Sequence, residues 1–394
     1  MKINPKSFEN IGRYTPYLAW AEQGLSPSEV KSRVMAILQK YLENPSVLSD
    51  LPIEILGFEA VSIQRLESDP WAAAMYRGIL SEYRLAFTAS PQKCAEAMIA
   101  WQDTLMRAQS EFHSQYLIEI DKCDLELDEF RVEIVRNIGA LLEACVQPNL
   151  RALLHQVRVR RSTRTEMTRL ESLKFGEVVD ELARTMSVPE LVAPPPARVK
   201  LHVFRNIAQH HSTFVRNGRI VCFYKTGLQA HEIEFTKSEL LELARRLMQI
   251  LGILRSARTI FYLDNANMLP NLPVGKVRPD VAFFLLAVAI ATQGFEIVAL
   301  DISEALAHLQ VQDVTDGNAR DRGIHASQFL LQVWMHSRAP SVRVTYIDKS
   351  GRARLIAEAK SSDCEDIADG RAPFEVLASR VAFSVPVSMQ PSST

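Results

Sequence analysis

Residues 194–211, PPPARVKLHVFRNIAQHH, separate two helical regions of this chain. Three consecutive prolines cannot continue a helix, because proline lacks the amide hydrogen and its ring clashes with the preceding turn. Beyond the prolines, apolar side chains recur at helical spacing: Val199, Val203, Ile207 and Ala208. The sequence therefore predicts that a helical block ends at the prolines and that a short helix covers residues 197–211.

The chain before this stretch predicts helices joined by turns. Ser26-Pro27-Ser28-Glu29 combines a capping serine, a first-turn proline and the reciprocal glutamate of a capping box. Two further helical patterns start at Pro70 and Pro91. Three more cover residues 125–145, 150–157 and 166–186. The pattern that starts at Pro91 continues toward Tyr116. We therefore expect a helical N-terminal domain over residues 1–124 and a second helical block after it.

The chain after this stretch predicts a small β insertion and then a helix. Two β-like runs, residues 219–224 and 231–235, flank Thr226-Gly227. The capping box Thr236-Lys237-Ser238-Glu239 opens a helix to about Leu254. We therefore expect a helical domain with a small β-hairpin insertion over residues 125–256.

The last part of the chain changes character. Strands are predicted at residues 259–263 and 295–300, helices at 278–292 and 324–336, and a hairpin at 342–347 and 354–357. This mixture predicts a smaller α/β domain over residues 257–394. The predicted fold class is therefore mainly α, with two helical regions followed by that α/β domain.

The composition is that of an ordinary globular protein. Of the 394 residues, 47% are hydrophobic and 23% charged, and the formal net charge is −1. A protein that coats nucleic acid non-specifically is far more basic, so any nucleic-acid contact has to come from a local patch.

The cysteines and apolar runs indicate the compartment. The five cysteines are scattered and odd in number, which argues against a disulfide framework and against a zinc knuckle. The first twenty residues lack a signal-peptide pattern, and the longest apolar run, residues 281–292, is too short to span a bilayer. We expect a cytoplasmic protein that does not enter a membrane.

Arg205 and His210 stand five residues apart near the end of the predicted short helix, and the polar Asn206 follows the arginine directly. RNA carries its own nucleophile, the 2′-hydroxyl group. Its cleavage needs a base, an acid and positive charge on the phosphorane. Histidine titrates near neutrality and serves as base or acid, whereas arginine stays charged and grips phosphate oxygens. The pattern indicates RNA cleavage without a metal or another cofactor.

One protomer offers only part of this machinery. Five residues advance about 500° around a helix, so Arg205 and His210 are offset by about 140°. Two copies that face each other across a two-fold axis supply two histidines and two arginines. The pattern therefore predicts a homodimer.

Residues 204–210, FRNIAQH, resemble the Arg-x4-His motif of the HEPN superfamily, including the polar residue after the arginine. The surroundings over about residues 125–254 are similar too: two long helices, a short helix with the motif, a small β excursion and a capped helix. The resemblance implies a composite ribonuclease site at a homodimer interface. Arg205 then stabilises the phosphorane, His210 is the general base or acid, Asn206 orients the phosphate or the histidine, and His211 assists.

The resemblance also bears on the biological role. The superfamily includes toxin ribonucleases, abortive-infection proteins and CRISPR effector nucleases, which implies phage defence or stress-induced dormancy and a regulatory or antitoxin partner. Many toxin members carry a tyrosine two residues after the histidine, whereas this chain has Ser212. Some HEPN domains only dimerise or bind ligands, so the alternative is a non-catalytic scaffold or sensor.

Two further patterns carry weaker hypotheses. Arg160, Arg161 and Arg164 belong to the densest basic run, which suits RNA phosphates or a solvated loop between helices. Glu358-Ala359-Lys360 resembles the Glu-x-Lys element of restriction-type nucleases, which hold magnesium with a further carboxylate. Asp348 lies in the predicted hairpin turn and not at a strand start, so a polar strand end is the default interpretation there.

Overall fold

The computed structural model describes residues 16–49, 53–116, 124–266 and 279–386. The fold is mainly α with a smaller α/β part, which confirms the predicted fold class. The chain forms two compact units. Unit 1 comprises Met1–Lys40, Leu48–Val61 and Val277–Thr394, and unit 2 comprises Tyr41–Val47 and Ser62–Lys276. This division differs from the three consecutive domains predicted from the sequence.

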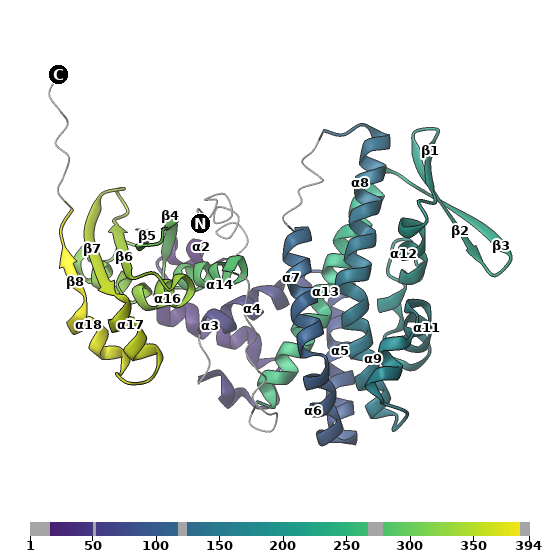
Figure 1. Cartoon of the computed structure of the whole chain (residues 1–394), viewed down its shortest axis with the longest axis horizontal. Coiled ribbons are helices and arrows are strands. Elements are labelled where there is room, and N and C mark those ends of the chain that lie inside the picture. Colours follow the sequence, from purple (N-terminus) through teal and green to yellow (C-terminus); the bar gives the residue numbers. More distant parts are fainter. Residues whose placement is uncertain (1–15, 50–52, 117–123, 267–278, 387–394) are drawn as a thin grey trace. The chain divides into compact units, whose positions relative to one another are not determined.

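Unit 2 is a bundle of helices with a small sheet, and Figure 1 labels most of its elements. Helix α5 packs against α13 and α9, and α8 packs against α12 and α13. The helices and helical turns of unit 2 are α5 (Pro70–Ala89), α6 (Pro91–Ala100), α7 (Gln102–Tyr116), α8 (Leu127–Ala140), η3 (Leu141–Val146), α9 (Gln147–Arg160), α10 (Met167–Ser172), α11 (Phe175–Thr185), η4 (Pro189–Val192), α12 (Leu201–Gln209) and α13 (Lys237–Asp264). Helix α4 (Ile53–Glu67) begins in unit 1 and ends in unit 2.

Helix α13 is longer than predicted. It starts at the predicted capping box of Thr236 but continues to Asp264, so the strand predicted at residues 259–263 is wrong. Its last turns stay helical because apolar side chains are buried on several faces, and the ring of Phe261 stacks on that of Tyr83 at 5.5 Å. A helix that runs through residue 256 also places no domain boundary there.

The end of α13 is fixed by a buried carboxylate. Asp264 accepts hydrogen bonds from the backbone amides of Glu43 at 2.8 Å and Asn44 at 2.6 Å, and Arg84 lies 3.3 Å away. The carboxylate therefore holds the segment before η1 (Pro45–Ser49) and is not free for a ligand.

The helical patterns at residues 125–145 and 150–157 belong to one continuous helical segment. Helix α8, the π-helical turn η3 and helix α9 follow each other from Leu127 to Arg160. Pro148 lies in the first turn of α9, and the amide of Gln147 donates to the carbonyl of Leu142, five residues earlier. The wider π turn accommodates the proline, which has no amide hydrogen to donate.

Three predicted helices have different limits in the structure. The predicted helix at 166–186 divides into α10 and α11, and the one that starts at Pro91 divides at Trp101 into α6 and α7. The short helix predicted from residue 197 starts at Leu201, because Arg198 has a positive φ of 50° and cannot lie within a right-handed helix.

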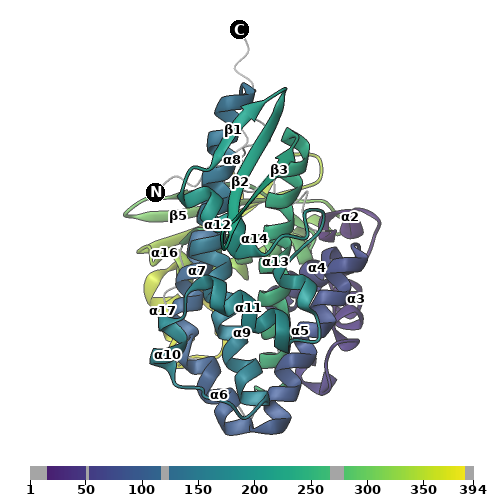
Figure 2. The ribbon, with the colours of Figure 1, turned by 90° about the vertical axis from the view of Figure 1, so that its right-hand side faces the viewer.

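The small sheet of unit 2 has three antiparallel strands: β1 (Thr213–Arg216), β2 (Arg219–Thr226) and β3 (Gln229–Phe235). The two predicted strands and the turn between them are confirmed, and Gly227 in that turn has a positive φ of 62°. The sequence did not reveal β1, which is only four residues long. Figure 1 shows β2 and β3 extending away from the helices of unit 2 as a ribbon, and Figure 2 views the molecule from the side to which this ribbon extends.

Unit 1 combines N-terminal helices with a mixed five-stranded sheet of order β4-β5-β6-β7-β8. Strands β5 and β6 are parallel and the other neighbours are antiparallel. Its elements besides the start of α4 are α2 (Tyr17–Glu22), α3 (Pro27–Gln39), α14 (Pro279–Thr292), β4 (Phe295–Ile302), β5 (Leu306–Asp313), α15 (Ala319–Ala326), α16 (Phe329–Ser337), β6 (Ser341–Ile347), β7 (Ala353–Lys360), α17 (Ser361–Ala368), η5 (Phe374–Val376), α18 (Leu377–Arg380) and β8 (Ala382–Ser384).

Several predicted elements of unit 1 are confirmed. The capping box of Ser26 opens α3, and α14, β4 and the β6–β7 hairpin lie where expected. The helix predicted at 324–336 is two helices, α15 and α16, and strands β5 and β8 were not predicted.

Helices α2 and α3 belong to unit 1 because they pack against α14. Helices α2 and α3 contact α14, and the hydroxyl of Tyr17 donates to the carbonyl of Gly57. A Cβ atom at Gly294 would lie 3.2 Å from that of Ala21, so this glycine allows the start of β4 to approach α2 closely.

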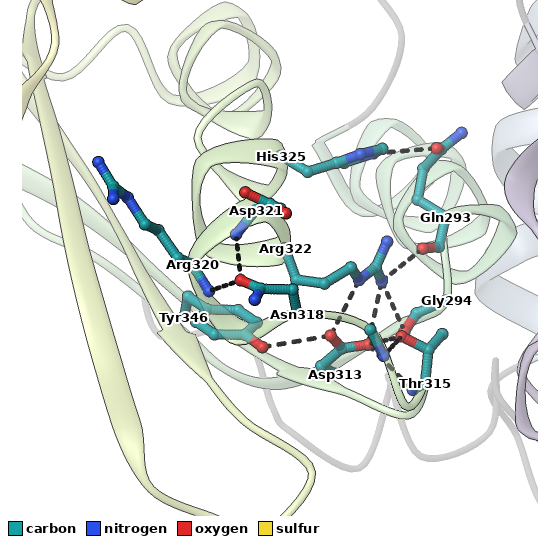
Figure 3. A network of polar contacts seen from close by, with 11 residues as sticks. Gln293, Gly294, Asp313, Thr315, Asn318, Arg320, Asp321, Arg322, His325 and Tyr346 are labelled. Atoms are coloured by element: carbon teal, nitrogen blue, oxygen red, sulfur yellow. Dashed lines mark hydrogen bonds and ion pairs between the residues drawn. The ribbon is translucent and has the colours of Figure 1, made fainter.

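A buried ion pair organises the end of strand β5, as Figure 3 shows. Arg322 binds both carboxylate oxygens of Asp313, at 2.9 and 3.0 Å, and stacks over the ring of Phe295. The hydroxyl of Tyr346 donates to the same carboxylate at 3.2 Å, and Thr315 donates to it too. Burial opposes ionisation, but the hydrogen bonds from Arg322 and Thr315 lower the pKa of Asp313. The network therefore ties the end of β5 to α15 and β6.

A second buried ion pair fixes unit 2. The side chain of Glu82 in α5 is fully buried and lies 2.9 Å from Arg160 at the end of α9. Glu82 also accepts hydrogen bonds from the amide and hydroxyl of Ser187, and Arg160 donates to the carbonyl of Thr185. The pair therefore joins α5, α9 and the chain that follows α11.

The Arg160→Ala variant is expected to destabilise the protein by about 3–5 kcal/mol, because it leaves the Glu82 carboxylate buried without its cation. Urea denaturation at pH 7 measures this loss. Arg161→Ala is the matched control, since Arg161 is the next residue and is exposed, and its effect should stay within about 0.5 kcal/mol. Equal stability of both variants would contradict the structural role of Arg160.

His155 in α9 is buried and neutral. The indole of Trp101 donates a hydrogen bond of 3.1 Å to its Nδ1 atom. Burial, together with the charge of Arg158, lowers the pKa of His155 from the ordinary 6.5 to about 4. At a pH between 4 and 6.5, His155 is therefore protonated in the unfolded chain and neutral in the folded chain.

The stability that depends on neutral His155 is expected to be complete above pH 6.5 and to be lost as the pH falls toward 4, by up to about 3 kcal/mol. The free energy of unfolding in urea at pH 7, 5.5 and 4.5 tests this. His155→Gln keeps an acceptor for Trp101 and should remove that part of the pH dependence. His211→Gln, at an exposed histidine, should keep the full pH dependence. An unchanged pH dependence in His155→Gln would refute the assignment.

Candidate functional site

Helix α12 places the predicted motif at the surface of unit 2. Leu201, Phe204 and Ile207 form its buried face, and the ring of Phe204 lies 6.2 Å from that of Phe235 in β3. On the other side Asn206 and the residues from Gln209 to His211 are exposed. The apolar face thus anchors the helix, and the polar motif residues face solvent.

A glycine lets α12 pack closely on α8. A Cβ atom at Gly139 would lie only 2.8 Å from the Cβ atom of Ala208, which real side chains do not tolerate without a shift. The same face of the α8 segment continues into η3, which also contacts α12. Glu143 of η3 is thereby brought to the motif.

Glu143 binds two side chains of the motif helix. Its Oε1 atom lies 3.0 Å from Nη2 of Arg205, and Nε2 of Gln209 donates to its two carboxylate oxygens at 2.9 and 3.0 Å. The Arg205 side chain is 28% exposed and that of Glu143 51%. The Nε atom of Arg205 is buried without a hydrogen-bond partner. The guanidinium is therefore held at the surface by a single ion pair.

The helix ends at the motif histidines. His210 is the C-terminal capping residue of α12 with a φ of −94°, and His211 after it adopts a left-handed φ of 50°. The amide of Ser212 donates to the carbonyl of Ile207 and that of His211 to Ala208, the two hydrogen bonds of a Schellman motif. This turn leads directly into β1 and leaves both imidazoles exposed.

The structure thus brings Arg205, Gln209 and Glu143 together, and it places His210 and His211 at the adjacent helix end. In unit 2 as described, no hydrogen bond or ion pair joins Arg205 to His210, in line with their expected angular offset. Sequence reasoning missed Glu143. Its only signal was a charged residue in the otherwise uncharged run LLEACV of residues 141–146.

The three arginines predicted to contact RNA have different environments. Arg160 is engaged by Glu82 and by the carbonyl of Thr185, so the prediction for this residue is corrected to a structural role. Arg161 and Arg164 are exposed. Arg161 follows Glu143 by 18 residues of continuous helix, about 27 Å along its axis, so these two arginines lie far from the motif.

The restriction-type pattern in unit 1 has no free carboxylate. Glu358 forms an ion pair with Arg343 on the neighbouring strand. Asp348 accepts hydrogen bonds from Ser350 and from the amide of Arg352 within the β6–β7 turn, and it also pairs with Arg354. Among the described residues no group of three or more His, Cys, Asp or Glu side chains is arranged to hold a metal ion. These carboxylates stabilise a hairpin.

The cysteines offer no further site in the described ranges. Cys94, Cys145, Cys222 and Cys364 are free and buried, and Cys123 lies outside the described residues. The part of the chain that the structure describes contains no helix with the length and apolar character needed to cross a bilayer.

Comparison with family models, curated proteins and solved structures found no match for this chain.

Replacing His211 by glycine is expected to stabilise the protein by up to about 1 kcal/mol, because glycine adopts the left-handed conformation at this helix end without strain. Thermal or urea unfolding measures the change. His210→Gly is the matched control and should give no gain, since His210 has a negative φ. A loss of stability in His211→Gly would show that the imidazole makes contacts that outweigh the backbone strain.

Proposed function

We propose that the chain is a metal-independent endoribonuclease of the HEPN type, whose active site is completed by a second copy of the protein. The observation that carries this proposal is the position of Arg205 and His210 at the exposed end of α12, outside the core. Neither the imidazole nor the guanidinium is buried in the core, so both groups are accessible to an RNA phosphate.

In the proposed reaction the 2′-hydroxyl oxygen attacks the adjacent phosphorus and the bond to the 5′-oxygen breaks. His210 of one protomer takes the 2′-hydroxyl proton, and His210 of the partner subunit protonates the leaving oxygen. Arg205 compensates the negative charge that develops on the phosphorane. The products are a 2′,3′-cyclic phosphate and a 5′-hydroxyl end, and the reaction consumes no water or oxidant.

The remaining residues have supporting roles in this proposal. Asn206 is exposed beside Arg205 in sequence and orients the phosphate or the imidazole. His211 assists as a second proton-transfer group. Arg161 and Arg164 contact a distant part of the RNA strand, because they follow the end of α9 and lie far from the motif.

The cellular setting of the proposal rests on the resemblance to HEPN proteins alone. A cytoplasmic ribonuclease acting in phage defence or dormancy needs restraint, so we infer a regulatory or antitoxin protein as partner. The second candidate function is a non-catalytic HEPN scaffold. The ion pair of Arg205 with Glu143 favours it, because an arginine that already has a carboxylate partner also serves as a surface contact.

Arg205→Ala and His210→Ala are each expected to reduce RNA cleavage at least about 100-fold, since one variant loses phosphorane stabilisation and the other loses proton transfer. The assay follows cleavage of total RNA by purified protein in the presence of EDTA. Sedimentation equilibrium of the same samples should show a dimer.

Arg245→Ala is the control variant, because Arg245 is an exposed arginine of α13 outside the motif. Its Nη1 atom lies 3.8 Å from a carboxylate oxygen of Glu242. This variant should cleave like the wild type. If Arg205→Ala cleaves RNA as fast as the wild type does, the proposal is refuted. Cleavage that requires magnesium and disappears in Lys360→Ala would move the chemistry to β7.

A further inference from the structure

We propose that Glu143 and Gln209 form a positioning pair that fixes the guanidinium of Arg205 for the RNA phosphate. This inference rests on the proposed ribonuclease function and concerns the same site. Neither residue is the arginine or the histidine of the Arg-x4-His motif. Gln209 is one of the four residues between them, and Glu143 lies 62 residues before Arg205 in the chain.

The first step is the geometry of the motif helix. Arg205 and Gln209 are four residues apart, so their side chains lie on the same face of α12, one turn from each other. Both reach the same carboxylate. Gln209 donates to its two oxygens, whereas Arg205 contacts Oε1 only. Gln209 therefore fixes the carboxylate, and the carboxylate fixes the arginine.

The second step is the position of Glu143 in the π-helical turn. A π turn changes which residues of a helix face a neighbour, and such turns are frequent at functional sites. Here the turn lies where the α8 segment passes α12, next to the close approach of Gly139 and Ala208. The fold thus holds the backbone of η3, which bears Glu143, closely against α12.

The third step concerns the donors that Arg205 keeps. A guanidinium carries five N–H donors, and Glu143 occupies one Nη2 direction. The Nε atom is buried, so the phosphate has to approach the Nη atoms at the exposed end. A guanidinium held in one plane is pre-organised to grip two phosphate oxygens, whereas a free one has to lose rotamer entropy first.

The charge of Glu143 does not prevent this role. Its side chain is half exposed, so water screens the repulsion between its carboxylate and an approaching phosphate. The orientation of Arg205 comes from the directed hydrogen bonds that Arg205 and Gln209 both donate to this carboxylate. The contribution of Glu143 is orientation, which affects the reaction step more than substrate binding.

The kinetic test compares Glu143→Ala, Glu143→Gln and Gln209→Leu with Glu133→Ala. Glu133 is the control because it lies on α8 in an i,i+3 ion pair with Arg136. RNA cleavage in EDTA should show about a 10- to 100-fold lower kcat for Glu143→Ala, with KM changed less than about threefold, because misplaced groups slow the reaction step. Gln209→Leu should also lower kcat. Glu143→Gln keeps an acceptor oxygen and should retain most of the activity.

A second measurement does not depend on catalysis. In ¹⁵N NMR spectra, rotation about the Cζ–Nε bond of Arg205 should be slow in the wild type and in Glu133→Ala, and fast in Glu143→Ala. The melting temperatures of all variants are recorded to confirm folding.

The outcomes separate the two proposals. Full activity and slow guanidinium rotation in Glu143→Ala would overturn the positioning role, while the ribonuclease proposal stands as long as Arg205→Ala is inactive. A wild-type protein without cleavage that depends on Arg205 would overturn the ribonuclease proposal and, with it, the catalytic meaning of the pair. A lower kcat together with fast rotation supports the inference.

Discussion

The close packing of α12 on the segment formed by α8, η3 and α9 is the constraint on which the candidate site depends. Gly139 leaves no side chain between the two helices, and Ala208 fills the contact. Because the approach is so close, the polar face of α12 is directed to solvent and its motif reaches Glu143. A larger side chain at either position would separate the helices and move Arg205 away from its carboxylate.

The same segment connects the site to the rest of unit 2. At its far end, Arg160 forms the buried ion pair with Glu82, and His155 accepts a hydrogen bond from Trp101 one turn earlier. Burying charged and polar groups costs free energy, and here the ion pair and the hydrogen bond offset part of that cost. These contacts fix α9 against α5 and α6 and so anchor the segment after the π turn, while the packing of Gly139 on Ala208 anchors it before the turn.

Unit 1 is organised by different means. Its buried pair of Asp313 and Arg322 joins the end of β5 to α15 and to Tyr346 of β6. The carboxylate of Asp313 accepts hydrogen bonds from Arg322, Thr315 and Tyr346, all within the unit. The polar residues most concentrated there therefore stabilise the fold, and the chemistry we propose belongs to unit 2.

The sequence by itself determined the elements whose signals are local. Capping boxes at Ser26 and Thr236, prolines at helix starts and the hairpin turn at Gly227 predicted their elements correctly, because backbone hydrogen bonding and glycine conformation act over a few residues. It also pointed to Arg205 and His210 at a helix end. Only the tertiary structure decided the length of α13, the joining of α2 and α3 to the α/β unit, the structural role of Arg160 and the presence of Glu143 beside the motif. Each of these depends on contacts between residues far apart in the chain, which helical periodicity and capping signals do not encode.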